Sequence, residues 1–183
     1  MSTVAAPATT TWTIDPSHSE VGFSVKHLMI STVRGRFAAV TGTIAFADDD
    51  FADASADVRI DAVSIDTREA KRDEHLRSAD FFDVETFPAL TFRSRAVRGA
   101  AGQAFQLVGD LTIKDTTREV VLDVVFEGTQ TDPWGQQKSG FSATTTISRS
   151  AFGLTWNAAL ETGGVLVGDD VKITLDVQLL KTA

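Results

Sequence analysis

Apolar and polar residues alternate along several stretches of this chain, and this alternation limits the possible folds more than any other feature. One case is 120–126, where Val120, Leu122, Val124 and Phe126 are apolar and the charged Asp123 lies between them. Such a period of two is typical of β-strands with one buried face. Together with less regular candidates, the pattern predicts eight strands, at 19–28, 34–46, 54–65, 89–97, 105–113, 120–126, 141–147 and 171–179.

The connections between these strands favour hairpins and one longer crossing. "DPWG" at 132–135 has the residues that a type I turn prefers. A charged segment around 67–79 predicts a single helix, and Phe81 and Phe82 directly after it are too apolar for open solvent. Eight antiparallel strands joined in this way predict an all-β protein, an extended eight-stranded antiparallel β-barrel crossed by that helix. A two-sheet sandwich is the structural alternative.

A barrel of eight strands either fills its interior with side chains or encloses a ligand cavity. Several predicted strands are long, and small residues such as Gly22, Gly42 and Gly109 recur among the large ones. We therefore expect a cavity. The alternative is a filled core in which the glycines only relieve strand curvature.

Composition excludes several classes of function. The formal net charge is −8, which argues against a nucleic-acid partner because binding phosphates requires a basic surface. The absence of cysteine excludes disulfides, thiolate nucleophiles and cysteine-based zinc sites. We expect residues 1–11 to be a disordered tail, 12–183 to be a single domain without an integral membrane segment, and the protein to be cytoplasmic.

Two of the three histidines bracket the first predicted strand. His27 has the parity of Val21, Phe23 and Val25, so it is expected on the same apolar face, whereas His18 has the opposite parity. About 30 Å of extended chain separates the two rings, so they cannot share a metal ion. We predict no metal site and no catalytic residue, and we assign His18 to local capping of a turn.

Basic residues gather near the bend that follows this strand. Lys26, His27, Arg34 and Arg36 flank the sequence "LMISTV", where they could receive an anionic head group if the bend lies at a barrel mouth. The alternative is that they are simply solvated.

The chain also resembles a known family over nearly its whole length after the tail. The matching segments, in order, are "TWTIDPSHSEVGFSVKH", "VRGRFAAVTGTIAF", "SIDTREAKRDEHLRSADFFDVETFPALTFRS", "GDLTIKDTTREVVLDVVF", "GFSATTTISRSAFG" and "VGDDVKITLDVQL". They resemble the YceI-like family. The resemblance implies a lipocalin-like barrel with an elongated hydrophobic channel that binds polyisoprenoid chains or similar amphiphiles. One departure is Lys114-Asp115, where such sequences commonly read Lys-Gly.

These observations predict a protein without cofactors that binds, carries or stores a long-chain isoprenoid or similar lipid. The alternative is an enzyme that acts on a lipid or prenyl phosphate and uses His27 or the Asp73/His75 segment. A homodimer is possible. The predicted ligand-binding residues are Val21, Phe23, Val25, His27, Arg34, Arg36, Phe81, Phe82, Phe105, Leu107, Leu122, Val124, Phe141, Ile173 and Leu175.

Overall fold

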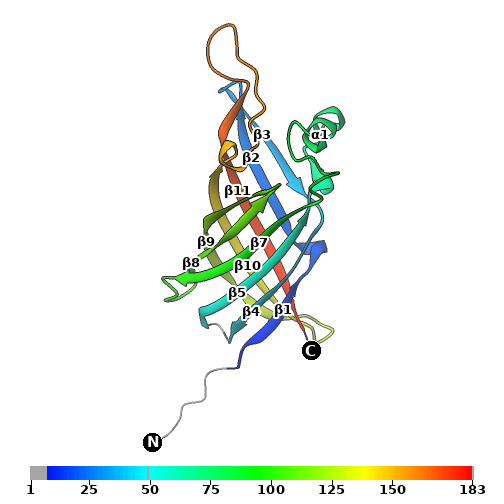
Figure 1. Cartoon of the computed structure of the whole chain (residues 1–183). Coiled ribbons are helices and arrows are strands. Elements are labelled where there is room, and N and C mark those ends of the chain that lie inside the picture. The colour runs from blue at the N-terminus through cyan, green and yellow to red at the C-terminus, as the bar shows by residue number, and fades with distance from the viewer. Residues whose placement is uncertain (1–7, 49, 183) are drawn as a thin grey trace, which may run out of the picture.

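The structure is a computed structural model that describes residues 8–48 and 50–182. Within these residues, eleven strands form one antiparallel sheet that winds into an elongated barrel (Figure 1). One α-helix, α1 (Ala70–Arg77), and three short 3-10 helices, Pro16–His18, Ala62–Ser64 and Ser150–Phe152, join the strands. The strands are β1 (Thr10–Ile14), β2 (Glu20–His27), β3 (Ser31–Phe37), β4 (Val40–Ala47), β5 (Asp50–Asp61), β6 (Ile65–Asp66), β7 (Ala89–Arg98), β8 (Ala104–Ile113), β9 (Thr116–Thr131), β10 (Gln137–Ser148) and β11 (Val167–Lys181).

The last strand closes the barrel because it pairs with segments from both ends of the chain. One side of β11 pairs with β10. Its other side pairs with β2 and, nearer the carboxyl terminus, with β1, so β1 and β2 lie end to end along it. Strands β3 and β4 lie end to end along β2 and β1 in the same way. Counted by position around the ring, the barrel has eight antiparallel members, which confirms the predicted architecture.

Two predictions at the amino-terminal side of the barrel are wrong in detail. The segment 34–46 is not one strand, because it is interrupted at Ala38 and Ala39. The N–H of Ala38 donates to the carbonyl of Ser64 at 3.2 Å, and the N–H of Ala39 donates to the hydroxyl of Ser64 at 3.0 Å, instead of to a neighbouring strand. Strand β1 begins at Thr10, inside the tail predicted for 1–11, because pairing with β4 and β11 orders this segment. Residues 1–7 of that tail lie outside the described residues.

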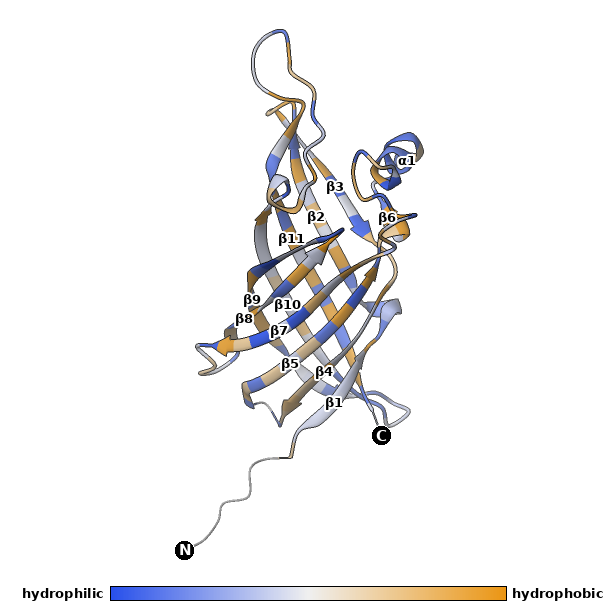
Figure 2. Cartoon of the chain, viewed as in Figure 1, coloured by the Kyte–Doolittle hydropathy of each residue, from blue (hydrophilic) through white to orange (hydrophobic). Residues whose placement is uncertain are grey.

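The alternation of side chains along the strands separates the interior from the surface. Val120, Leu122, Val124 and Phe126 of β9 are buried, while their neighbours Asp123 and Glu127 are exposed. Figure 2 shows the same alternation of hydrophobic and hydrophilic residues along the other long strands. In the turn between β8 and β9, where the chain departs from the family pattern, Lys114 has a positive φ of 57° and Asp115 does not have a positive φ.

Aromatic rings fill one end of the barrel, near the two chain termini. Phe51 packs against Phe105, Phe126 and Phe141, with ring centroids 5.0–5.6 Å apart. Trp12 stacks on Phe46 at 5.2 Å and an interplanar angle of 4°. Each aromatic pair of this kind contributes roughly 0.5–1.5 kcal/mol beyond the area that it buries. This end of the barrel is therefore closed by its own core.

Two connections cover the opposite end. The strap, residues 67–88, contains α1, which lies within the predicted 67–79, and the closing loop, residues 153–166, connects β10 with β11 (Figure 1). Glu69 caps α1 by accepting hydrogen bonds from the N–H groups of Lys71 and Arg72. The strap and the closing loop meet at Trp156, whose ring centroid lies 4.7 Å from that of His75 and 5.5 Å from that of Phe81.

Candidate functional site

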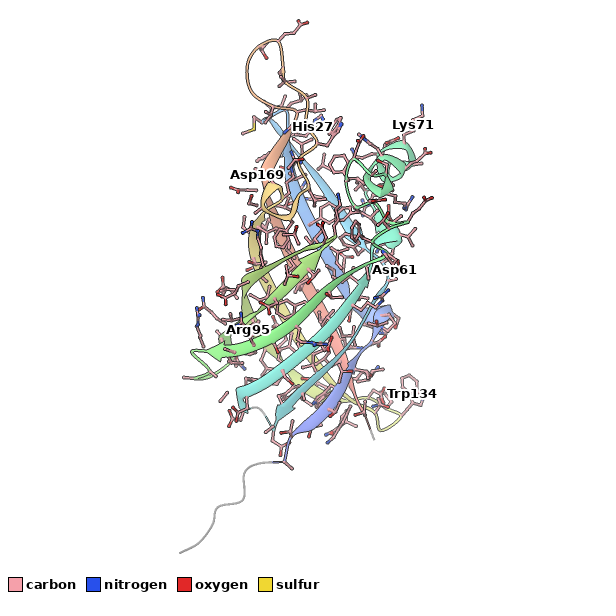
Figure 3. The ribbon with its side chains drawn as sticks, viewed as in Figure 1. His27, Asp61, Lys71, Arg95, Trp134 and Asp169 are labelled. Atoms are coloured by element: carbon pink, nitrogen blue, oxygen red, sulfur yellow. The ribbon has the colours of Figure 1, made fainter. Side chains whose placement is uncertain are left out.

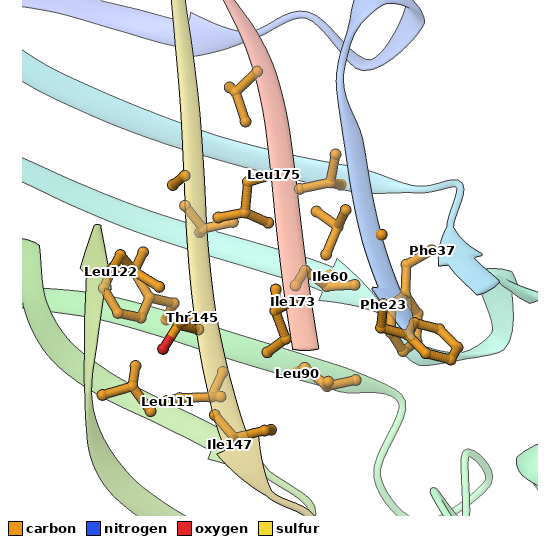
Figure 4. A pocket seen from close by; sticks show the side chains of 18 of the residues that line it. Phe23, Phe37, Ile60, Leu90, Leu111, Leu122, Thr145, Ile147, Ile173 and Leu175 are labelled. Carbon is orange, nitrogen blue, oxygen red and sulfur yellow. The ribbon is translucent and has the colours of Figure 1, made fainter. Parts of the chain in front are cut away.

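A cavity of about 270 Å³ lies inside the barrel, between the aromatic end and the strap. This volume is well above the roughly 10–15 Å³ that one water molecule requires. Inward-facing side chains of strands all around the ring form its wall, and they converge from opposite sides of the barrel (Figure 4). The accessible wall is apolar throughout, so the cavity suits a hydrocarbon chain better than a polar molecule.

Twelve of the fifteen predicted ligand-binding residues lie at this cavity. Strand parity explains their placement, because inward residues alternate with outward ones along each strand. Contact with a ligand stays a prediction for all of them. The twelve are Val21, Phe23, Val25, Phe81, Phe82, Phe105, Leu107, Leu122, Val124, Phe141, Ile173 and Leu175.

The three polar candidates do not line the cavity, which corrects their expected placement at its polar end. Arg34 and Arg36 are exposed and have the outward parity of β3, and the Arg36 guanidinium lies 3.6 Å from Glu20 and 3.7 Å from Asp66. His27 is the last residue of β2 and half-buried, at the end of the molecule that carries the strap (Figure 3). It does not line the cavity, although its β-sheet partner Val167 does.

The sequence predictions missed a further part of the wall. These residues lie on the strands whose alternation is less regular, or on the closing loop, which has no period at all. Pairing of β5 with β4 and β7, which the sequence alone does not show, would have identified some of them. They include Phe37, Ile44, Ile60, Leu90 and Leu154.

The glycines contribute less to the cavity than expected. A Cβ at Gly109 would lie 2.5 Å from the ring of Phe92, so that ring already occupies the space beside this glycine. A Cβ at Gly42 would similarly meet the backbone of β5 and the side chain of Ile14. Gly109 and Gly42 therefore admit close packing of their neighbours. The volume of the cavity therefore depends on the barrel architecture and not on these two glycines.

Arg149 is the only ionisable residue among those that line the cavity in the described part of the chain. Its side chain is buried, and its guanidinium donates to the carbonyls of Gly168, Leu154, Trp156 and Val167 at 2.6–3.3 Å. Burial lowers the pKa of this guanidinium, and the nearby Asp169 carboxylate partly opposes that effect. Leu154 and Trp156 belong to the closing loop, whereas Val167 and Gly168 belong to β11, so Arg149 ties the closing loop to the start of β11.

The other histidines take part in local structure. His18 was predicted to cap a turn, but the capping residue is Asp15, whose carboxylate accepts a hydrogen bond from the backbone N–H of Ser17; His18 Nδ1 lies 2.8 Å from that carboxylate. His75 Nε2 lies 2.9 Å from Asp80, and its ring packs against the closing loop. Over residues 8–48 and 50–182, the side chains form no cluster of three potential metal ligands, and no helix has the length and hydropathy to span a membrane.

Comparisons with known proteins agree with this architecture. A protein of Staphylococcus aureus (strain USA300), described as a UPF0312 protein, is 42% identical over 168 residues, which cover 89% of this chain and 93% of the relative. Among solved structures, BcnA of Burkholderia cenocepacia has a TM-score of 0.78 at 26% identity, covering 90% of this chain and 98% of its own. The YceI protein of Campylobacter jejuni has a TM-score of 0.73 at 30% identity, covering 86% and 90%.

A domain of Saccharophagus degradans shares only 13% identity but has the same fold, with a TM-score of 0.69 and coverage of 93% of this chain and 98% of that domain. It is described as a polyisoprenoid binding domain implicated in plant cell wall breakdown. The model of the YceI-like domain matches residues 12–179, almost the whole barrel. The chain therefore belongs to the YceI-like family.

Proposed function

We propose that this protein binds the hydrocarbon chain of an isoprenoid or a similar long amphiphilic lipid inside its barrel, as a carrier or a store, and that it catalyses no reaction. The observation that carries this proposal is the apolar cavity of about 270 Å³ enclosed by the barrel. Burial of each methylene group contributes about 0.8 kcal/mol, so an aliphatic chain gains affinity here without polar contacts.

The wall chemistry favours binding over catalysis. Acid–base or nucleophilic catalysis requires an ionisable or nucleophilic group within hydrogen-bond reach of the reacting atoms. Among the described residues, the one ionisable side chain at this wall, Arg149, donates its hydrogen bonds to backbone carbonyls, and the accessible wall is apolar. The enzymatic alternative uses His27 or the Asp73/His75 segment, and none of these three residues lines the cavity.

The choice of an isoprenoid as the first ligand to test follows from the family. The Saccharophagus degradans domain is described as polyisoprenoid binding, and it shares the fold of this chain. A branched, unsaturated chain also suits a wall built of Val, Leu, Ile and Phe side chains.

Calorimetric titration with a long-chain prenol tests the proposal. We expect saturable binding at one ligand per barrel and a negative heat-capacity change, because apolar surface leaves water on binding. Binding of the prenol with no heat-capacity change, or no saturable binding of any long-chain lipid, would contradict the proposal.

A further inference from the structure

Apolar side chains are exposed at the tip of the hairpin between β2 and β3. Leu28, Met29 and Ile30 are 37%, 60% and 83% exposed. Val165 of the closing loop is 39% exposed, and the loop adjoins the tip because the N–H of Leu28 donates to the carbonyl of Leu166 at 2.8 Å. Four of the seven exposed large apolar side chains among the described residues thus belong to this one end of the barrel. Such a concentration is typical of an interaction site.

The backbone of the tip is unfavourable for the residues that it carries. The N–H of Ile30 donates to the carbonyl of His27 at 3.2 Å, and the two residues between them, Leu28 and Met29, have φ angles of 52° and 60°. Turns of this kind strongly prefer Asn-Gly, because bulky side chains are disfavoured at positive φ. Stability alone would therefore not select Leu and Met here, which suggests that the apolar tip has a function.

The tip directly continues the wall of the cavity. Val25 of β2 and Val167 of β11 line the cavity, and His27, two residues after Val25, pairs with Val167. The exposed tip begins at the next residue. Figure 3 places His27 at the same end of the molecule as Lys71 of the strap, and Trp134 at the opposite end. The apolar tip thus lies at the end where the strap and the closing loop cover the barrel.

Exposure and charge indicate what this tip contacts. Its exposed aliphatic side chains can insert into fluid hydrocarbon. Lys26 and Arg34 are exposed on the outer face just below it, where they can reach lipid phosphates, although the chain as a whole is acidic. Glu161 of the closing loop is an exposed acid in the same region, so we expect apolar insertion to supply most of the binding.

We propose that the tip, residues 28–30, docks on the surface of a lipid bilayer and places the covered end of the barrel there for exchange of its ligand. The exchange step rests on the lipid-binding function proposed above. Docking itself does not, because it depends on surface residues that do not line the cavity.

Co-flotation with vesicles tests the docking. The vesicles consist of phosphatidylcholine, alone or mixed with phosphatidylglycerol. The first variant combines Leu28→Asn with Met29→Gly. It removes two apolar side chains and supplies the residues that the turn prefers, so it should melt at a temperature no lower than the original. The second variant is Ile30→Ser. The matched control is Trp134→Ser, which removes an apolar side chain that is 87% exposed at the opposite end.

We expect the original protein and the Trp134→Ser variant to float with phosphatidylcholine vesicles. Each tip variant should lose at least about tenfold in partition coefficient. The prenol affinity in vesicle-free solution should stay unchanged in all of them. No flotation of the original protein, equal flotation of the tip variants, or an equal loss in the control would overturn the proposal. So would a tip-dependent dimer in sedimentation experiments without vesicles. A protein that floats but binds no prenol would refute the proposed function and leave the docking intact.

Discussion

Replacing Thr145 with phenylalanine should block ligand binding by filling the middle of the cavity. Thr145 is on β10, pairs with Ile173 and lines the cavity, into which Figure 4 shows it pointing. Phenylalanine adds about four heavy atoms, which displace roughly four methylene groups of a bound chain. At about 0.8 kcal/mol each, the loss is about 3 kcal/mol, or on the order of 100-fold in dissociation constant.

The neighbouring position supplies a matched control. Thr144 is exposed on the outer face of the same strand, so Thr144→Phe adds the same side chain outside the cavity. Displacement of a fluorescent long-chain lipid by prenol would measure both affinities. We expect the inward variant to lose binding at unchanged melting temperature, since the added ring fills existing space, and the outward variant to bind as the original does. Equal affinities for the two variants would refute the reasoning that the ligand occupies this cavity.

Three further predictions concern the parts of the fold that surround the cavity. Gly109→Ala should lower the free energy of unfolding by about 1–3 kcal/mol in urea denaturation, because its Cβ would clash with Phe92; a cost below 0.5 kcal/mol would contradict this packing. Asp15→Asn should lower the free energy of unfolding by about 1–3 kcal/mol at neutral pH, since the carboxylate accepts several hydrogen bonds. The hydrogen bond from the Ser17 side chain is the largest cause that lowers the pKa of Asp15 below its usual 3.8. The stabilisation by this carboxylate is therefore complete above about pH 4 and is lost as the pH falls below that value. An Asp15→Asn variant whose free energy of unfolding differs from that of the original protein by as much at pH 2 as at pH 7 would contradict this account. Trp156→Ala should speed hydrogen exchange in α1 and ligand release, because it removes the contact between the closing loop and the strap; unchanged rates for both would show that this contact does not hold the end closed.

The strands that sequence periodicity predicted best are those whose environment differs most between their two faces. β9 alternates between buried and exposed residues over most of its length, so its inward set could be identified from Val120 to Phe126. By contrast, the interruption at Ala38 and Ala39 depends on hydrogen bonds to Ser64, which is distant in sequence. Periodicity contains no information about such long-range partners.

The candidate site was predictable in part for the same reason. Parity places Phe23 and Val25 on the inner face, but it does not say where along a strand the cavity ends, so His27 was assigned to its wall. Leu154 and Arg149 reach the cavity through an irregular connection whose course depends on hydrogen bonds to backbone carbonyls. The expected cytoplasmic location and possible homodimer stay predictions, because the geometry of one chain does not determine either.

The most direct test of the central claim is to locate the ligand. A crystal structure of the protein saturated with a long-chain prenol should show continuous density inside the barrel, between the aromatic rings around Phe51 and the strap that carries Phe81, with one ligand per chain in native mass spectrometry. Density only on the outer surface, or an interior without a ligand in a protein that binds prenol in solution, would contradict the account.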